Sequence, residues 1–224
     1  MTRTHATTLR TCLGIAALLA ATAAPAQQAA APTAKVEIRD MPNLNKITVE
    51  SPNFSARANT PSSLTRRPRE WGVIDVTYRT QTAPGNKDKW IDNVTAVFHV
   101  MAENPKPPQD GKRFSYYTLR VRYVNVPDGD HRAGVVLPPS YLERYGSIVA
   151  VGCEITADGA DKPAEKGEAS LPDLKSNDKK PDDFWWKNPN VVNNAQLVAK
   201  RDGLVERSQS PFALLNMDDY EAVK

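Results

Sequence analysis

The sequence has little cysteine. Cys12 and Cys153 are the only two in 224 residues, and Cys12 lies in a segment that we expect to be removed. Cys153 then has no intrachain partner, so a disulfide framework is excluded and the fold must be held by a hydrophobic core. The chain is long enough to bury such a core within one domain.

Long hydrophobic runs are also scarce. An apolar run lies near the N-terminus, between Leu13 and Ala23, and it is too short to span a bilayer. Arg3 and Arg10 precede it, and the small residues of Ala24–Ala26 follow it. This order predicts a secretory signal peptide, residues 1–26, cleaved after the second alanine of that tripeptide. We therefore expect an exported protein in the periplasm, at the outer-membrane surface or outside the cell, without a transmembrane anchor after cleavage.

An excess of charge of one sign is missing from the mature chain. The formal net charge falls from +3 to +1 when Arg3 and Arg10 leave with the leader. Binding to nucleic acid usually needs a clustered basic face. Nucleic acid is therefore not expected as a partner.

The sequence does contain a series of short segments in which apolar side chains recur at every second position. The clearest are 71–80, 90–102 and 114–126, and turn residues separate them. Such alternation is typical of strands with one buried face. Further strands are expected at 35–39, 46–50, 133–137 and 148–156. A helical turn is expected at 138–145, where Gly146 can cap it, and a hairpin of 196–200 with 204–208 around Asp202-Gly203.

These segments predict a mainly β fold class: an antiparallel immunoglobulin-like β-sandwich with long polar loops and one short helix. We expect residues 27–34 to form a flexible tether and residues 35–224 to form a single β-sandwich domain. A long polar insertion near 157–190 is expected to be mobile over much of its length. The Cys–Trp–Cys pattern of antibody domains is missing, which leaves immunoglobulin-like and fibronectin-like sandwiches open.

Catalytic motifs are missing as well. The chain has no GxSxG elbow, no HExxH helix and no phosphate-binding glycine loop. His99 is interpreted as a strand histidine with a hydrogen-bond partner. Cys153 is interpreted as a buried thiol, because the period of two places it with Val149 and Val151 on the core face of 148–156. Asp128–His131 is interpreted as a turn, because it lacks the further ligands of a calcium loop. We therefore expect no enzymatic activity, no catalytic residues, no cofactor and no metal.

Two segments are candidate contacts for a partner or a glycan. Phe184, Trp185 and Trp186 follow one another in a charged region. Adjacent tryptophans cannot both face inward on a strand, and an exposed one would suit sugar stacking or protein contact. The favoured alternative is that this cluster closes one end of the sandwich. The second candidate consists of Arg66, Arg67 and Arg69, for which a solvated loop is the favoured interpretation.

The leader, the segments WGVIDVTYRT and WIDNVTAVFHVMA, and the run 114–126 give the chain a family likeness. It resembles secreted immunoglobulin-like proteins associated with a type IV pilus gene cluster of mucin-degrading Verrucomicrobia. The resemblance implies an exported, non-enzymatic binding or structural protein at a pilus or the cell surface. It supplies no functional residues, and the chain lacks the uninterrupted apolar helix of a pilin.

The expected partners are other envelope or pilus proteins, or a glycan, and homo-oligomerisation stays open. The alternative function is a carbohydrate-binding module that uses exposed aromatic residues.

Overall fold

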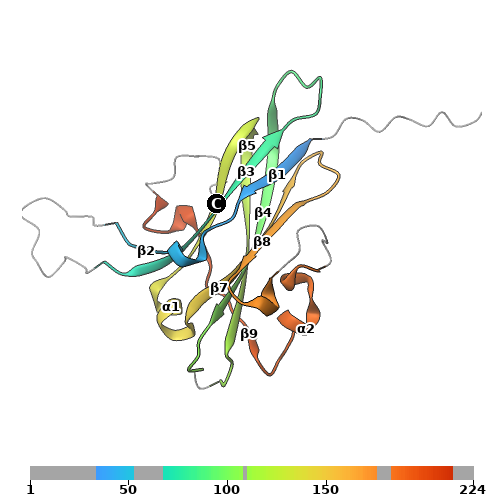
Figure 1. The fold of residues 1–224 in the computed structure, drawn as a ribbon. Coiled ribbons are helices and arrows are strands. Elements are labelled where there is room, and N and C mark those ends of the chain that lie inside the picture. Colours follow the sequence, from blue (N-terminus) through green and yellow to red (C-terminus); the bar gives the residue numbers. More distant parts are fainter. Residues whose placement is uncertain (1–33, 53–67, 108–109, 176–182, 214–224) are drawn as a thin grey trace, which may run out of the picture. The chain divides into compact units, whose positions relative to one another are not determined.

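The computed structural model describes residues 34–52, 68–107, 110–175 and 183–213. These residues form two β-sheets that face each other across a shared core (Figure 1). The predicted fold class, a mainly β sandwich, is confirmed. Within the described ranges, no helix is both long and apolar enough to cross a membrane.

One sheet, called sheet A, has β3 and β6 at its centre. The chain of hydrogen-bonded neighbours runs β1, β3, β6, β10, and β2 also pairs with β3. All of these pairs are antiparallel. The strands are β1 (Lys35–Asp40), β2 (Thr48–Glu50), β3 (Glu70–Gln81), β6 (Gly129–Leu137) and β10 (Val205–Glu206).

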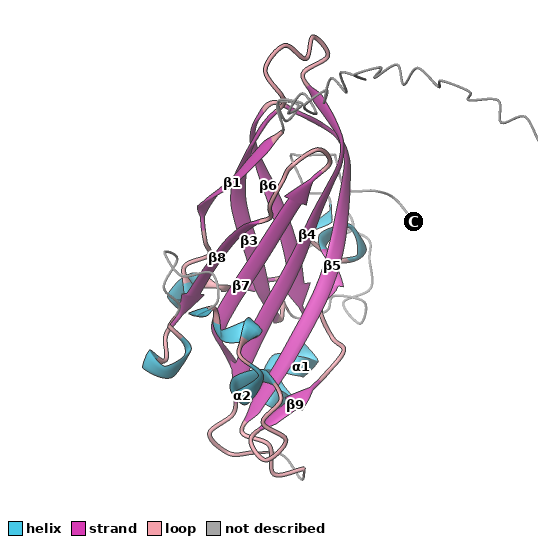
Figure 2. Ribbon diagram, turned by 90° about the vertical axis from the view of Figure 1, so that its right-hand side faces the viewer, coloured by secondary structure: helices cyan, strands magenta, loops and turns pink. Residues whose placement is uncertain are grey.

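The other sheet, called sheet B, has β7 and β4 at its centre. Its order is β8, β7, β4, β5, β9, and only the short β5–β9 pair is parallel. Figure 2 faces this sheet and shows α2 and β9 near its lower end. The strands are β4 (Trp90–Glu103), β5 (Phe114–Pro127), β7 (Ser147–Ala157), β8 (Ala164–Ala169) and β9 (Val198–Lys200).

Short helical segments connect the strands. A second α-helix accompanies the one expected from the sequence. The segments are α1 (Pro139–Tyr145), α2 (Pro189–Val192), and the 3-10 turns η1 (Leu44–Lys46), η3 (Pro172–Leu174), η5 (Trp185–Lys187) and η6 (Arg207–Gln209). The expected C-cap of the first helix is confirmed, since Gly146 has φ 91° and its N–H donates to Leu142 O.

The alternation seen in the sequence becomes burial in the structure. Ile74, Val76 and Tyr78 on β3 are fully buried between the sheets. On β4 the inward residues Val94 and Phe98 are fully buried as well. The four longest strands therefore begin and end within a few residues of their predicted bounds, because one of their faces is apolar at every second position.

One expectation about β7 is wrong. The period of two places Val149 on the same face as Val151 and Cys153. The pairing of β4 with β7 shifts register between Met101 and Ala102. The shift lets Val149 pack outside sheet B, while Val151 and Cys153 stay between the sheets.

The predicted hairpin around Asp202-Gly203 is also wrong. β9 pairs with β5 in sheet B, and β10 pairs with β6 in sheet A. The chain crosses from one sheet to the other here, and Arg201 Nε donates to Ser115 Oγ at 2.8 Å beside the crossing. Gly203 then passes so close to Tyr141 that a Cβ would lie 2.4 Å from its ring.

The polar region near 157–190 contains more regular structure than the sequence suggests. β8 lies within it and pairs antiparallel with β7 over six residues. Polar residues can pair here because β8 is an edge strand with one solvent-facing side. Ala169 is its one buried side chain.

Candidate functional site

An open groove of about 860 Å³ lies at the end of sheet A where β1 begins and β3 ends. Its walls are β1, the end of β3, the turn residues 128–129 and residues 161–162 from the β7–β8 connection. Side chains on a strand alternate, so Lys35, Glu37 and Arg39 share the outer face of β1. The groove therefore presents both signs of charge along an edge strand.

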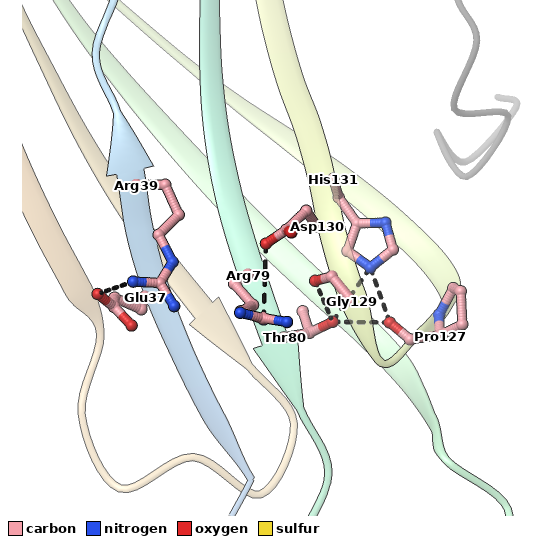
Figure 3. Close-up of polar contacts among 8 residues, drawn as sticks. All are labelled: Glu37, Arg39, Arg79, Thr80, Pro127, Gly129, Asp130 and His131. Atoms are coloured by element: carbon pink, nitrogen blue, oxygen red, sulfur yellow. Dashed lines mark hydrogen bonds and ion pairs between the residues drawn. The ribbon is translucent and has the colours of Figure 1, made fainter.

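Exposed ion pairs order these charges. Arg39 Nη1 lies 2.7 Å from Glu37 Oε1, and Arg79 Nε lies 3.6 Å from Asp130 Oδ1 (Figure 3). All four side chains are at least 41% exposed. Ion pairs this exposed contribute only about 0–1 kcal/mol. A charged partner can therefore replace either pair at little cost to the fold.

The floor of the groove is fixed by partly buried hydrogen bonds. Thr80 Oγ1 and His131 Nε2 each lie 2.7 Å from the carbonyl oxygen of Pro127 (Figure 3). Beside them, the backbone N–H of Thr82 donates to Asp128 Oδ1 at 2.6 Å. The β5–β6 turn is thus tied to the end of β3, and the charged residues stand on a preorganised support.

The turn does not gather its acidic and histidine residues around one point. Asp130 faces outward to Arg79, whereas His131 faces inward, with its ring centroid 5.4 Å from that of Tyr78. Asp128 is engaged by Thr82. Among the described residues, no group of three or more His, Cys, Asp and Glu side chains could hold a metal ion.

A second feature, called here the aromatic cluster, consists of Phe184, Trp185 and Trp186 packed on the outer face of sheet B. The three residues are 1%, 2% and 5% exposed. Trp186 stacks on His99 at 5.5 Å between ring centroids. Its ring also lies directly over Gly152, where a Cβ would come within 2.3 Å. The glycine is required for this approach.

Polar contacts fix the orientation of the cluster. Trp186 Nε1 donates to Glu154 Oε1 at 2.7 Å, and His99 Nδ1 is hydrogen-bonded to the Tyr116 hydroxyl at 2.6 Å. His99 Nε2 lies 3.5 Å from Glu154 Oε1. This histidine, the largest influence on Glu154, lowers the pKa of its carboxyl group. Burial, followed by the nearby Glu154 charge, raises the pKa of Tyr116 to about 12.

The sequence left open whether one of the two tryptophans is exposed, and in the structure both are buried. They lie in a 3-10 turn and not on a strand, so strand alternation does not apply and both rings are buried. The cluster covers the outer face of sheet B and does not close an end of the sandwich. Contact of Phe184, Trp185 and Trp186 with a partner or glycan stays a prediction, and in this arrangement their ring faces are occupied.

The arginine candidates are placed only in part. Arg66 and Arg67 lie outside the described residues. Arg69 is exposed, and its Nη2 donates to Glu143 Oε1 at 2.6 Å. It lies near α1, away from the groove on sheet A.

Two interpretations of single residues are confirmed. His99 has the hydrogen-bond partner expected of a strand histidine. Cys153 is fully buried in the core, and burial raises the pKa of its thiol. Such a thiol has little thiolate character at neutral pH.

Two features of the surface were not predicted from the sequence. Trp90 is 46% exposed, the most exposed of the tryptophans whose placement is described. Trp90 is the first residue of β4, and a side chain at a strand end need not be covered by neighbouring strands. This position was a usable signal of its exposure. The groove was not predicted either, although Lys35, Glu37 and Arg39 place a charge at every second position of 35–39.

Comparisons with known proteins support this description. A protein-family model matches residues 27–224. No curated protein shows significant similarity to the chain. Among solved structures, a crystal structure of a protein from Akkermansia muciniphila is similar with a TM-score of 0.59 and 20% sequence identity. The likeness covers 85% of this chain and 94% of that chain.

At this identity, the structural likeness shows a shared fold. Together with the family match, it confirms the predicted likeness to a protein of the Verrucomicrobia. The association with a pilus gene cluster stays a prediction. The family model begins directly after the expected signal peptide and reaches the last residue. The chain therefore belongs to the family that this model describes, and its sandwich has a counterpart in Akkermansia muciniphila.

Proposed function

We propose that this chain is an exported, non-enzymatic binding or structural protein that joins a pilus or another cell-surface assembly through the groove on sheet A. One observation carries the proposal: the groove presents exposed charges of both signs on a floor fixed by partly buried hydrogen bonds. Complementary charges give specificity and fast association at protein interfaces. A polar segment of an envelope protein is the partner that fits these charges.

The position of the groove supports a peptide-like partner. Lys35, Glu37 and Arg39 follow one another at every second residue along β1. An extended segment that lies beside this strand would meet them at the same spacing. Acidic, basic and acidic side chains at alternate positions would complement the three charges in order.

The cellular location is part of the proposal. The leader predicts export, and the resemblance to proteins of a pilus gene cluster supplies the pilus association. If residues 1–26 are removed, the intact mass of protein from its native host will correspond to a chain that begins at Gln27. Recovery of the uncleaved chain from the cytoplasm would contradict export.

Site-specific photo-cross-linking in the native host tests the groove. A photoreactive residue at Gln81, which lines the groove, should capture an envelope or pilus protein, whereas one at Ser140 on α1 should not. The double variant R39E/R79E should lose the Gln81 cross-link. K46E/K200E changes the total charge equally at exposed sites away from the groove and should retain it. Equal capture from both positions, or capture unaffected by R39E/R79E, would contradict the proposal.

Trp90 favours a second candidate function, carbohydrate binding. An indole that is 46% exposed can stack on a sugar ring. A glycan array with the mature protein and with Trp90→Ala tests this alternative. If the mature protein binds glycans that Trp90→Ala does not bind, carbohydrate binding becomes the favoured function.

A further inference from the structure

The edge of sheet B formed by β5 is open for most of its length. β5 runs from Phe114 to Pro127, and β4 pairs with it throughout this range. β9 pairs only with residues 114–116 on the other side (Figure 2). Among the described residues, the remainder of β5 has a neighbouring strand on one side alone.

Hydrogen bonds at the paired end show which main-chain groups face this edge. The N–H of Phe114 donates to Leu197 O, and the carbonyl of Tyr116 accepts from the N–H of Arg201, both at 2.9 Å. The register with β4 is constant along β5, so every second residue turns its N–H and C=O the same way. The open edge therefore presents the main-chain groups of Thr118, Arg120 and Arg122.

Two main-chain groups elsewhere on the sandwich are covered by side chains. Lys166 Nζ donates to Arg39 O at 2.8 Å along β1. The Tyr123 hydroxyl accepts from the N–H of Gly134 at 3.0 Å between β5 and β6. Uncovered edge groups are a template for an added strand. The chain itself uses this template once, where β9 occupies the first residues of the edge.

The side chains on this stretch set the charge of a matching strand. Arg120 and Arg122 are exposed on the outer face, next to each other in the period of two. Arg122 Nε donates to Asn93 Oδ1 at 2.8 Å. The amide of Asn93 is neutral, so this hydrogen bond does not compensate the positive charge of Arg122. No described residue forms an ion pair or hydrogen bond with the side chain of Arg120.

We propose that the open edge of β5, from Thr118 to Arg122, adds an extended protein segment that carries acidic residues at two alternate positions. The main chain of the segment pairs with Thr118, Arg120 and Arg122, and its two carboxylates face the two guanidinium groups. Opposite charges on directly opposed residues stabilise a strand pair. This site is separate from the groove on sheet A and does not depend on it.

The same charges disfavour a second copy of the chain as the occupant. An antiparallel pair of β5 strands centred on Val121 would set Arg120 of one copy against Arg122 of the other. A pair centred on Arg120 would oppose the two copies of that residue. Like charges in these positions destabilise the pair, so these registers favour a partner of different sequence.

Peptide binding to the mature protein tests the proposal. One probe is a short fluorescent peptide of Val and Thr with Glu at two alternate positions, and its matched control carries Lys there. We expect the Glu peptide to bind about tenfold more tightly. R120E/R122E should reverse this preference. K46E/K87E, an equal charge change at exposed sites outside both β5 and the groove, should leave it unchanged.

Main-chain pairing is tested separately from charge attraction. Methylation of alternate amide nitrogens on one edge of the Glu peptide, prepared in both alternations, should abolish binding for the alternation that faces β5. The amides of Arg120 and Arg122 should also exchange more slowly with the unmodified peptide bound. Equal binding of Glu and Lys peptides, equal binding of both methylated forms, or a dimer of the mature protein that R120E/R122E dissociates would overturn the proposal. Loss of the groove cross-link alone would leave it standing.

Discussion

The outer faces of the two sheets differ in what they present to solvent. On sheet B, Phe184 and Trp186 are 1% and 5% exposed and cover the strands beneath them. On sheet A, the Arg79 and Asp130 side chains are 53% and 60% exposed and line or border an open groove. The first face extends the hydrophobic core, whereas the second leaves its charges available. We infer that the aromatic cover on the outer face of sheet B serves stability and that the groove end of sheet A serves contact.

The sequences of the central strands account for this difference. The outward positions of β4 include Val97, His99 and Met101, which favour a cover of apolar rings. The outward positions of β3 include Thr77 and Arg79, which favour water. Covering the first set buries apolar area worth roughly 25 cal/mol per Å².

The largest expected effect comes from removing the cover. Trp185→Ala with Trp186→Ala should lower the free energy of unfolding by several kcal/mol, because each buried Trp→Ala change costs about 3–5 kcal/mol and neighbours do not add simply. Urea unfolding of the mature protein measures the loss. An unchanged midpoint together with lost partner binding would mean that the cluster is a contact site and not a cover.

A smaller effect is expected between the sheets. Cys153→Ser should destabilise the protein by about 1–3 kcal/mol, because it places a hydroxyl in a fully buried apolar site. The native thiol should also react slowly with thiol reagents until the protein unfolds. Fast labelling of folded protein would show that this part of β7 is accessible.

Acidification should affect the two faces in opposite directions. The pKa of Glu154 is lowered, chiefly by His99, so its contribution to stability is present above the unfolded value of about 4.5 and is lost as the pH falls through the folded value. The pKa of Asp75 on sheet A is raised, chiefly by burial, although Arg207 lies 2.8 Å away and opposes the shift. The contribution of Asp75 to stability is present below the pKa of the unfolded state and is lost as the pH rises through the pKa of the folded state.

Urea unfolding at a series of acidic pH values, with Glu154→Gln and Asp75→Asn beside the parent, measures these contributions. The stability advantage of the parent over Glu154→Gln should shrink on acidification. The stability of the parent relative to Asp75→Asn should rise. If the stability difference between parent and variant changes with pH in the same direction for both variants, the environments assigned to Glu154 and Asp75 are contradicted.

The smallest effect is expected in the groove. Arg79→Ala should change the free energy of unfolding by no more than about 0.5 kcal/mol, because its ion pair is exposed. Thermal unfolding provides the measurement. A loss of several kcal/mol would show that this arginine holds the fold.

The strands could be predicted from the sequence because their signal is local. The alternation of Ile74, Val76 and Tyr78 fixes a strand and its buried face without knowledge of its neighbours. The position of Trp186 could not be predicted in this way, because it depends on Gly152 in a distant strand. The failed hairpin has the same cause, since Arg201 is held by Ser115 of β5. The groove likewise requires β1 and the β5–β6 turn to lie side by side.

One paired measurement tests most directly whether the aromatic cover of sheet B provides stability and the groove of sheet A provides partner contact. The variants W185A/W186A and R39E/R79E are compared for melting temperature and for the cross-link formed at Gln81 in the native host. We predict that W185A/W186A melts several degrees lower, and that R39E/R79E melts as the parent does and loses the cross-link. A normal cross-link in R39E/R79E, or a normal melt with a lost cross-link in W185A/W186A, would contradict the account.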